Sequence, residues 1–238
     1  MTEKLLQVEA LEAGYGDVQV LWGLSLAVAP GAVATLIGAN GAGKTTTLHA
    51  IMGAIAPRRG RVVFAGEDVT ALPPHAKTAR GLVLVPEGRQ LFAEMSVQEN
   101  LEMGAFSRRA RRRLKDRLDQ VYVLFPRLKE RRAQKAGTFS GGEQQMLAIG
   151  RALMSDPQLL IIDELSLGLA PVMVQRLASK LETLKRTGLA ILLVEQNVHL
   201  ALALASYAYV IAEGRPFAEG PSGQIAAMPE IKQAYLGL

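Results

Sequence analysis

The sequence lacks cysteine altogether among its 238 residues. Disulfide bonds, thiolate metal sites and cysteine nucleophiles are therefore excluded. Histidine is nearly as scarce, and the wide separation of His49, His75 and His199 does not suggest a metal-binding cluster. Aromatic residues make up only 5% of the chain, so we expect a core of mostly aliphatic side chains.

Neither a membrane-spanning segment nor a signal peptide is indicated. The uncharged stretch 196–212 falls short of the roughly 20 apolar residues that span a bilayer, and we predict a buried helix followed by a strand there. The N-terminus carries Glu3, Lys4 and Glu9 and has no long apolar core. We therefore expect a soluble chain, which does not prevent docking on a membrane protein.

Basic residues are concentrated in one segment, although the formal net charge of the chain is only +5. Residues 107–135 contain 12 Lys or Arg against 3 Asp or Glu, whereas the rest of the chain carries 15 basic and 19 acidic residues. The dense run at 108–117 has three interpretations: a solvated helix face, attraction to anionic lipid headgroups, or nucleic-acid binding. The run lacks interleaved aromatic residues for base stacking, and we expect no nucleic-acid partner.

Short apolar runs alternate with helical patterns along most of the chain. Such runs suit strands that are buried on both faces of a parallel sheet. Their alternation with helices predicts an α/β fold with a mostly parallel sheet and helices on both faces. The buried strands are expected at 32–37, 81–85, 159–162 and 189–194, the main helices at 44–53, 140–154 and 172–186, and a closing hairpin at 207–219.

Two regions depart from this alternation. Near the N-terminus we predict a strand at 5–10, a strand pair at 18–28, an edge strand at 61–64 and a turn at 65–68, with helix continuation blocked at Pro73-Pro74. Residues 96–150 have a helical pattern that breaks near Pro126, which predicts a subdomain inserted into the core. We expect one domain over 1–238, with 1–88 and 151–238 as the core and 89–150 as the helical subdomain.

Residues 38–45 match the phosphate-loop pattern G-x-x-x-x-G-K-[ST] without exception. In such loops, glycines let backbone N–H groups surround phosphate oxygens, and the positive end of the following helix points to the same place. A chance glycine-rich turn is the alternative, but a predicted strand precedes this loop and a helix follows it. We therefore predict an Mg-ATP site in which Lys44 reaches the β- and γ-phosphates and Thr45 coordinates Mg²⁺. The predicted loop contacts are Gly38, Asn40, Gly41, Ala42, Gly43, Lys44, Thr45 and Thr46.

Two acids follow the apolar run 159–162 directly. The strand is expected to deliver Asp163 and Glu164 to the carboxyl edge of the sheet, where ligands bind in open α/β folds. Asp163 is predicted to hold Mg²⁺ through its water shell, and Glu164 to orient or deprotonate the attacking water. Two solvated acids at a strand end are the alternative, which the nearby phosphate-loop motif disfavours.

A second glycine-rich helix start occurs at 139–146, with the sequence Phe-Ser-Gly-Gly-Glu-Gln-Gln-Met. Ser140 and Glu143 have the spacing of a capping box, and Met146, Ile149, Gly150 and Leu153 are expected on the buried face of the helix. A capping box does not require Gly141 and Gly142, however. Paired glycines at a helix N-terminus make an open anion site, which could receive the γ-phosphate of a nucleotide bound to another molecule.

Together these motifs resemble an ABC transporter nucleotide-binding subunit over nearly the whole chain. Ser140 to Gln144 is similar to that family's signature, and Tyr15 has the position of its adenine-stacking aromatic residue. The finer resemblance is to the ATP-binding subunits of bacterial branched-chain amino-acid importers, the LivF type. It is carried by 37–46, 85–89, 124–128, 140–154, 166–171, 193–197 and the C-terminal Ala234-Tyr235-Leu236-Gly237.

The resemblance implies a P-loop NTPase core with a mostly parallel sheet, an N-terminal antiparallel β subdomain and an inserted helical subdomain. It also implies ATP hydrolysis at sites shared between two chains, where one phosphate loop faces the partner's Ser140, Gly141, Gly142 and Glu143. A second ATP-binding subunit, identical or related, two permease subunits and indirectly a periplasmic solute-binding protein are the implied partners. The implied location is the cytoplasmic face of a bacterial inner membrane.

Besides Phe139, which stands where leucine is usual in the signature, four positions depart from the usual family pattern. Glu87 replaces a glutamine that offers oxygen to Mg²⁺ or water, and Gln196 replaces a switch histidine, so it cannot carry a positive charge. Both replacements are familiar in the branched-chain group, and we assign Glu87 to the metal and Gln196 to catalysis with Lys44 and Glu164. Leu165 replaces a proline, which predicts a looser Glu164, and Leu169 replaces a frequent aspartate.

Two rival functions remain open. An ABC ATPase acting on ribosomes or DNA usually has two nucleotide domains or a long coiled-coil insertion, and this sequence shows one phosphate loop and no sustained heptads. An importer of urea or another amide is the nearer rival, because its ATP subunits are similar.

Overall fold

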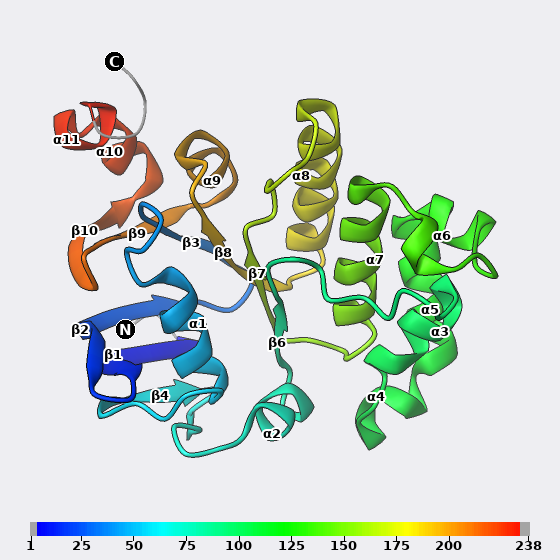
Figure 1. The fold of residues 1–238 in the computed structure, drawn as a ribbon, viewed down its shortest axis with the longest axis horizontal. Helices are drawn as coiled ribbons and strands as arrows, with labels where there is room; N and C mark the ends of the chain where they lie inside the picture. The colour runs from blue at the N-terminus through cyan, green and yellow to red at the C-terminus, as the bar shows by residue number, and fades with distance from the viewer. Residues whose placement is uncertain (1–3, 234–238) are drawn as a thin grey trace.

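The computed structural model describes residues 4–233, which form two sheets with helices packed around them (Figure 1). The larger sheet has the strand order β10-β9-β3-β8-β7-β6, and all its neighbouring strands are parallel except β9 and β10. The predicted α/β fold with a mostly parallel sheet is therefore confirmed. The strands are β3 (Val33–Ile37), β6 (Leu82–Val85), β7 (Leu159–Asp163), β8 (Ala190–Glu195), β9 (Tyr207–Ala212) and β10 (Arg215–Pro221).

The smaller sheet is antiparallel, with the order β2-β1-β4-β5. Its strands are β1 (Leu6–Tyr15), β2 (Val18–Val28), β4 (Arg59–Phe64) and β5 (Glu67–Asp68). Three predictions were wrong here, since β2 is one strand rather than a pair, β4 lies inside the sheet, and half of the predicted turn at 65–68 is β5. The strand predicted at 5–10 extends to Tyr15, because Ala10 has a φ of 43° at a register shift that interrupts the apolar alternation.

The helices are α1 (Lys44–Met52), α2 (Pro74–Ala79), α3 (Val97–Gly104), α4 (Arg108–Arg112), α5 (Leu114–Leu124), α6 (Pro126–Glu130), the 3₁₀ helix η1 (Ala136–Thr138), α7 (Gly141–Leu153), α8 (Pro171–Arg186), α9 (Val198–Leu204), α10 (Ser222–Ala227) and α11 (Pro229–Ile231). Within the helical pattern predicted over 96–150, residues 97–124 form three separate helices, because Ser107 caps a new start at α4 and Arg113 separates α4 from α5. Pro74 does not block a helix but starts α2, where its missing N–H costs nothing.

The core explains why the central strands are continuously apolar. Along β7, Leu160 and Ile162 pack with the helices α5, α7 and α8, whereas Leu159 and Ile161 pack with α1 and the smaller sheet. Successive side chains of a strand point to opposite faces, so both faces are covered. Figure 1 shows the smaller sheet and helices α3 to α7 on opposite sides of the larger sheet.

The C-terminal third contains the predicted closing hairpin, which β9 and β10 form. The stretch 196–212 forms the predicted helix and strand, α9 and β9. Within residues 4–233, no helix combines the length and apolar character needed to cross a membrane. The C-terminal motif Ala234-Tyr235-Leu236-Gly237 lies outside the described residues.

Candidate nucleotide-binding site

The predicted phosphate loop connects β3 to α1 at the carboxyl edge of the larger sheet. Gly41 and Gly43 have φ values of 80° and 104°, which side chains other than glycine rarely adopt. A Cβ on Gly38 would lie 2.5 Å from the carbonyl oxygen of Ile211, so this glycine is required by close packing. The helix α1 begins without a side-chain cap at Gly43, which leaves its first N–H groups available to an anion.

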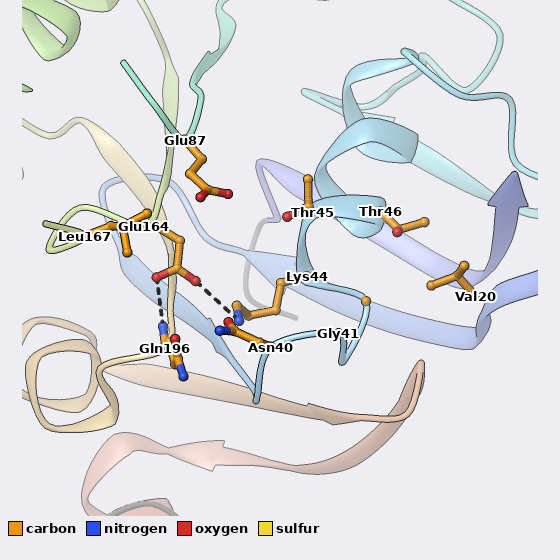
Figure 2. A pocket seen from close by; sticks show the side chains of 11 residues that line it. Val20, Asn40, Gly41, Lys44, Thr45, Thr46, Glu87, Glu164, Leu167 and Gln196 are labelled. Atoms are coloured by element: carbon orange, nitrogen blue, oxygen red, sulfur yellow. Dashed lines mark hydrogen bonds and ion pairs between the residues drawn. The ribbon is translucent and has the colours of Figure 1, made fainter. Parts of the chain in front are cut away.

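The loop borders an open cavity of about 210 Å³ (Figure 2). Polar groups from four separate chain segments meet there, although they lie up to 156 residues apart in the sequence, from Asn40 to Gln196. This cavity is the place where the predicted phosphate contacts and the predicted catalytic residues converge. Its lining is Val20, Asn40, Gly41, Gly43, Lys44, Thr45, Thr46, Glu87, Glu164, Leu167 and Gln196. Gly38 and Ala42 belong to the loop without lining the cavity.

The side chain of Lys44 folds back over the loop, and only 6% of its surface is exposed. Its Nζ donates to the carbonyl oxygens of Gly38 and Ala39, at 2.9 and 3.2 Å, and lies 3.3 Å from Glu164 Oε1. The loop therefore presents a preorganised ammonium group beside a carboxylate. A phosphate oxygen entering the cavity would take the place of these acceptors.

Glu164 approaches the cavity from the end of β7, opposite the loop, and Glu87 approaches from the segment after β6 (Figure 2). The backbone of Glu164 has a φ of 50° and is fixed by its N–H, which donates to Val194 O at 2.9 Å. Its Oε2 accepts from the backbone N–H of Gln196 at 3.4 Å. The strand ends of β7 and β8 thus place Glu164 and Gln196 together.

Asp163 lies behind this edge, with 4% of its surface exposed. Burial raises the pKa of its carboxyl group to about 7, with the charges of Glu164 and Glu87 adding to the effect and Lys44 opposing it. Its Oδ1 is buried and has no hydrogen-bond partner among the described residues. A buried, unpaired carboxylate surrounded by acids fits a divalent cation, which would satisfy the free oxygen and neutralise the local charge.

Residues 4–233 contain no group of three or more His, Asp or Glu side chains that could hold a metal by itself. Mg²⁺ does not require such a group, since it is usually bound through one or two carboxylates together with phosphate oxygens and waters. The residues that fit such a cation are Asp163, Glu87 and the hydroxyl of Thr45.

Tyr15 is not among the residues that line the cavity. It ends β1, is 47% exposed, and its hydroxyl group lies 3.0 Å from Nδ1 of His49 on α1. The ring therefore remains accessible on the surface near the phosphate-loop helix, and its adenine-stacking role stays a prediction.

The second glycine-rich start is separate from the cavity. Ser140 Oγ accepts from Glu143 N at 3.4 Å and Glu143 Oε2 accepts from Ser140 N at 3.0 Å, which confirms the predicted capping box of α7. None of Ser140, Gly141, Gly142 and Glu143 lines the cavity of their own chain. A Cβ on Gly142 would lie 2.5 Å from Met173 Cε, the flexible end of a side chain on α8, so a larger residue here would displace that side chain.

The predicted buried face of α7 was partly wrong. Ile149, Gly150 and Leu153 are buried, but Met146 is only partly buried. Gln145, Leu147 and Ala148 are buried as well, because α7 packs against α3, α8 and the larger sheet rather than along one stripe.

Sequence reasoning missed Val20 and Leu167, which line the cavity through pairings that no local pattern reveals. It also assigned no role to Glu195, which is fully buried beside the site. A signal for Glu195 was present, because it directly follows an apolar run just as Asp163 does.

Comparisons with known proteins agree with this geometry. The family model "ABC transporter" matches residues 21–166. The chain is 45% identical to the branched-chain amino acid transport ATP-binding protein BraG of Pseudomonas aeruginosa, over 98% of this chain and all of that protein, and 33% identical to a probable LivF protein of Archaeoglobus fulgidus, over 98% and 99%. Its fold is similar to the ADP conformation of MJ1267, an ABC transporter cassette, with a TM-score of 0.86, 28% identity and full coverage of both chains. The chain therefore belongs to the ABC transporter family, as an ATP-binding domain that hydrolyses ATP.

Proposed function

We propose that this chain is the ATP-hydrolysing subunit of a membrane importer for branched-chain amino acids. The observation that carries the proposal is the 45% identity to BraG over essentially both whole chains. Most of the cavity residues expected from that resemblance, including Glu87 and Gln196, also gather around one phosphate loop.

Within the proposed site, each group has a chemical role. Lys44 and the backbone of 38–46 bind the phosphates, Tyr15 stacks on adenine, and Gln196 contacts the γ-phosphate region. Mg²⁺ is the metal, held by Thr45, Asp163 and Glu87, and it neutralises phosphate charge when bound. Glu164 accepts a proton from the attacking water or orients it, because its carboxylate reaches the cavity beside Lys44.

The proposed site is completed by a second chain. The turn formed by Ser140, Gly141, Gly142 and Glu143 lies outside the cavity of its own chain. A partner's copy of this turn would supply the remaining N–H donors to the γ-phosphate. The proposed assembly contains a second ATP-binding subunit, two permease subunits and, indirectly, a periplasmic solute-binding protein, at the cytoplasmic face of the inner membrane. In the proposed domain division, 89–150 is the helical subdomain and 1–88 with 151–238 is the core.

Three arginines of the basic segment take part in packing within the chain. Arg109, Arg113 and Arg117 all reach the single carboxylate of Asp156, which comes three residues before β7. These cations are therefore partly neutralised and help to fasten α4 and α5 to the core. An importer of urea or another amide is the remaining alternative.

Uptake of labelled leucine, isoleucine and valine in a strain that lacks this gene tests the proposal. We expect uptake of all three to fall and to be restored by the wild-type gene, but not by Lys44→Ala. The matched control is Lys232→Ala, an exposed lysine that does not line the cavity, which should restore uptake fully. Normal uptake of the three amino acids together with lost uptake of urea would replace the proposal by the amide importer.

A further inference from the structure

A buried carboxylate beside the cavity has no part in the site described so far. Glu195 is the last residue of β8, and its exposed fraction is 0%. Burial raises the pKa of this carboxyl group above its ordinary value, against the opposing effect of its hydrogen bonds. Burying a carboxyl group away from water costs free energy unless its oxygens accept hydrogen bonds.

The partners of Glu195 belong to two loops. Oε1 accepts from the backbone N–H of Ser166 at 2.9 Å, and Oε2 accepts from the Ser166 hydroxyl group at 3.0 Å. Oε2 also accepts from the backbone N–H of Asn197 at 3.4 Å. One side chain therefore joins the loop that follows β7 to the loop that follows β8.

Both loops carry a proposed catalytic residue. Ser166 comes two residues after Glu164, and Asn197 directly follows Gln196. The same loops are linked a second time by the bond from Gln196 N to the Glu164 carboxylate. A displacement of Ser166 would therefore be passed to Glu164 through a single intervening residue, Leu165.

Glu164 needs such support because its backbone is unusual. It has a φ of 50° without being glycine, a conformation that persists only when the surroundings hold it. Leu165 follows it, so the turn lacks a proline that would stiffen it, and Leu165 is itself buried in the core.

We propose that Glu195 is a positioning residue for ATP hydrolysis, which fixes Ser166 and Asn197 and thereby the geometry of Glu164 and Gln196 in the cavity. The inference rests on the proposed role of Glu164. It explains how the turn at Glu164 is held in place without a proline, and why a carboxylate occupies a fully buried position. It also predicts a specific effect, since a shifted Glu164 lowers the rate of hydrolysis but leaves the phosphate loop intact.

The test measures kcat and KM for ATP, the affinity for a fluorescent ATP analogue, and the melting temperature of Glu195→Gln. Gln has nearly the same shape, but its amide nitrogen cannot accept from Ser166 or Asn197. We expect kcat to fall by about 10-fold or more, with KM and nucleotide affinity changed less than about twofold, because small misplacements near a reacting centre cost up to about 100-fold.

The matched control is Thr35→Val, which removes a buried hydrogen bond to Leu193 O in the same sheet but away from the two loops. We expect it to lower the melting temperature and preserve kcat. If Glu195→Gln loses no more kcat than Thr35→Val at an equal loss of melting temperature, the inference is overturned.

A milder variant and a parallel variant complete the design. If Glu195→Gln does not fold, Ser166→Ala takes its place as the test, because it removes only the hydroxyl donor. A fall in kcat at unchanged KM supports the inference. An unchanged kcat refutes it. Glu164→Gln is measured in parallel. If it retains turnover, the proposed catalytic role fails; if it loses turnover while Glu195→Gln matches the wild type, only the positioning role fails.

Discussion

The phosphate loop and the turn before α7 are both glycine-rich helix starts, yet they differ in what their first N–H groups do. At α1, Gly43 offers no side-chain cap and the first turn carries no acid. At α7, Ser140 caps the helix and Glu143 lies in the first turn, where it also pairs with Arg131 at 3.2 Å. The first helix start is open to a phosphate within its own chain, whereas at the second Ser140 satisfies the N–H of Glu143 and leaves the N–H groups of Gly141 and Gly142 for the proposed contact with a partner's nucleotide.

This difference separates binding from hydrolysis. The cavity beside α1 is lined by an ammonium group, two threonine hydroxyls and two carboxylates, all from one chain, and the open start of α1 adds N–H donors for a phosphate. The α7 start lies outside that cavity, so its contribution requires another molecule. Variants at the two starts should therefore have different effects on nucleotide affinity and on turnover.

The largest effect on ATP hydrolysis is expected from a substitution of Glu164. Glu164→Gln should lower the rate of phosphate release by about 1,000-fold, because it removes the group proposed to activate water. ATP affinity should be preserved, since Lys44 and the loop are unchanged. The control is Glu213→Gln, another glutamate with a φ of 50° but outside the cavity. Near-normal phosphate release by Glu164→Gln would refute the proposed role.

The next effect concerns the α7 start. Gly142→Asp places a carboxylate where the partner's γ-phosphate is proposed to bind and should lower turnover by about 100-fold, the scale of a lost charge-stabilising donor. The affinity of one chain for a fluorescent ATP analogue should change less than about twofold. Gly223→Asp, at a helical glycine with open space around it, is the control. A loss of affinity equal to the loss of turnover would contradict the separation of binding from hydrolysis.

A smaller effect should distinguish capping from function at Glu143. Burial acts to raise the pKa of this carboxyl group, but hydrogen bonds from Ser140 and the charges of Arg131 and Arg127 outweigh it and lower the pKa. Glu143→Ala should lower the free energy of unfolding by about 1 kcal/mol at pH 7. Because the pKa is lowered on folding, this contribution is lost as pH falls through the folded-state value.

The control for Glu143 is the same motif elsewhere in the chain. Ser96 and Glu99 form an equivalent capping box at α3, outside the cavity. Urea denaturation should show a similar loss for Glu99→Ala, but only Glu143→Ala should also lower ATP turnover. Equal ATP turnover of Glu143→Ala and Glu99→Ala would mean that the capping box of α7 only stabilises its helix.

The smallest effect is expected on the pH dependence of stability, from Lys77 near the C-terminal end of α1. Lys77 is fully buried and its Nζ donates to Ile51 O at 2.7 Å; burial lowers its pKa to about 8, with Asp68 opposing. Between pH 8 and 10.5 the unfolded chain binds a proton that the folded chain does not, so stability rises with pH. Relative to Lys77→Met, the wild type should gain about 1 kcal/mol between pH 7 and 9 in urea denaturation. A flat difference would refute the lowered pKa.

Sequence reasoning succeeded where the structural cause was local. The phosphate loop is fixed by glycines at defined spacing, and the α7 capping box needs only Ser140 and Glu143 three residues apart. The central strands were also predictable, because burial on both faces of β7 requires a continuous apolar run.

It failed where distant pairings decide the outcome. The length of β1 depends on a bulge near Ala10 and on pairing with β2 and β4. Val20 and Leu167 reach the cavity only through the folding of separate segments. One of the two hydrogen-bond partners of Glu195, Ser166, lies 29 residues away in the sequence, so the link between the two loops required the three-dimensional contacts.

Mixing two inactive variants tests the central claim most directly. Lys44→Ala disables the phosphate loop and Gly142→Asp disables the α7 start, so a mixed dimer keeps one site with both halves intact. We predict that each variant alone is inactive and that an equimolar mixture recovers up to about a quarter of wild-type turnover, as random pairing into two-fold dimers requires. A mixture that remains as inactive as its components would contradict a site shared between copies of this chain.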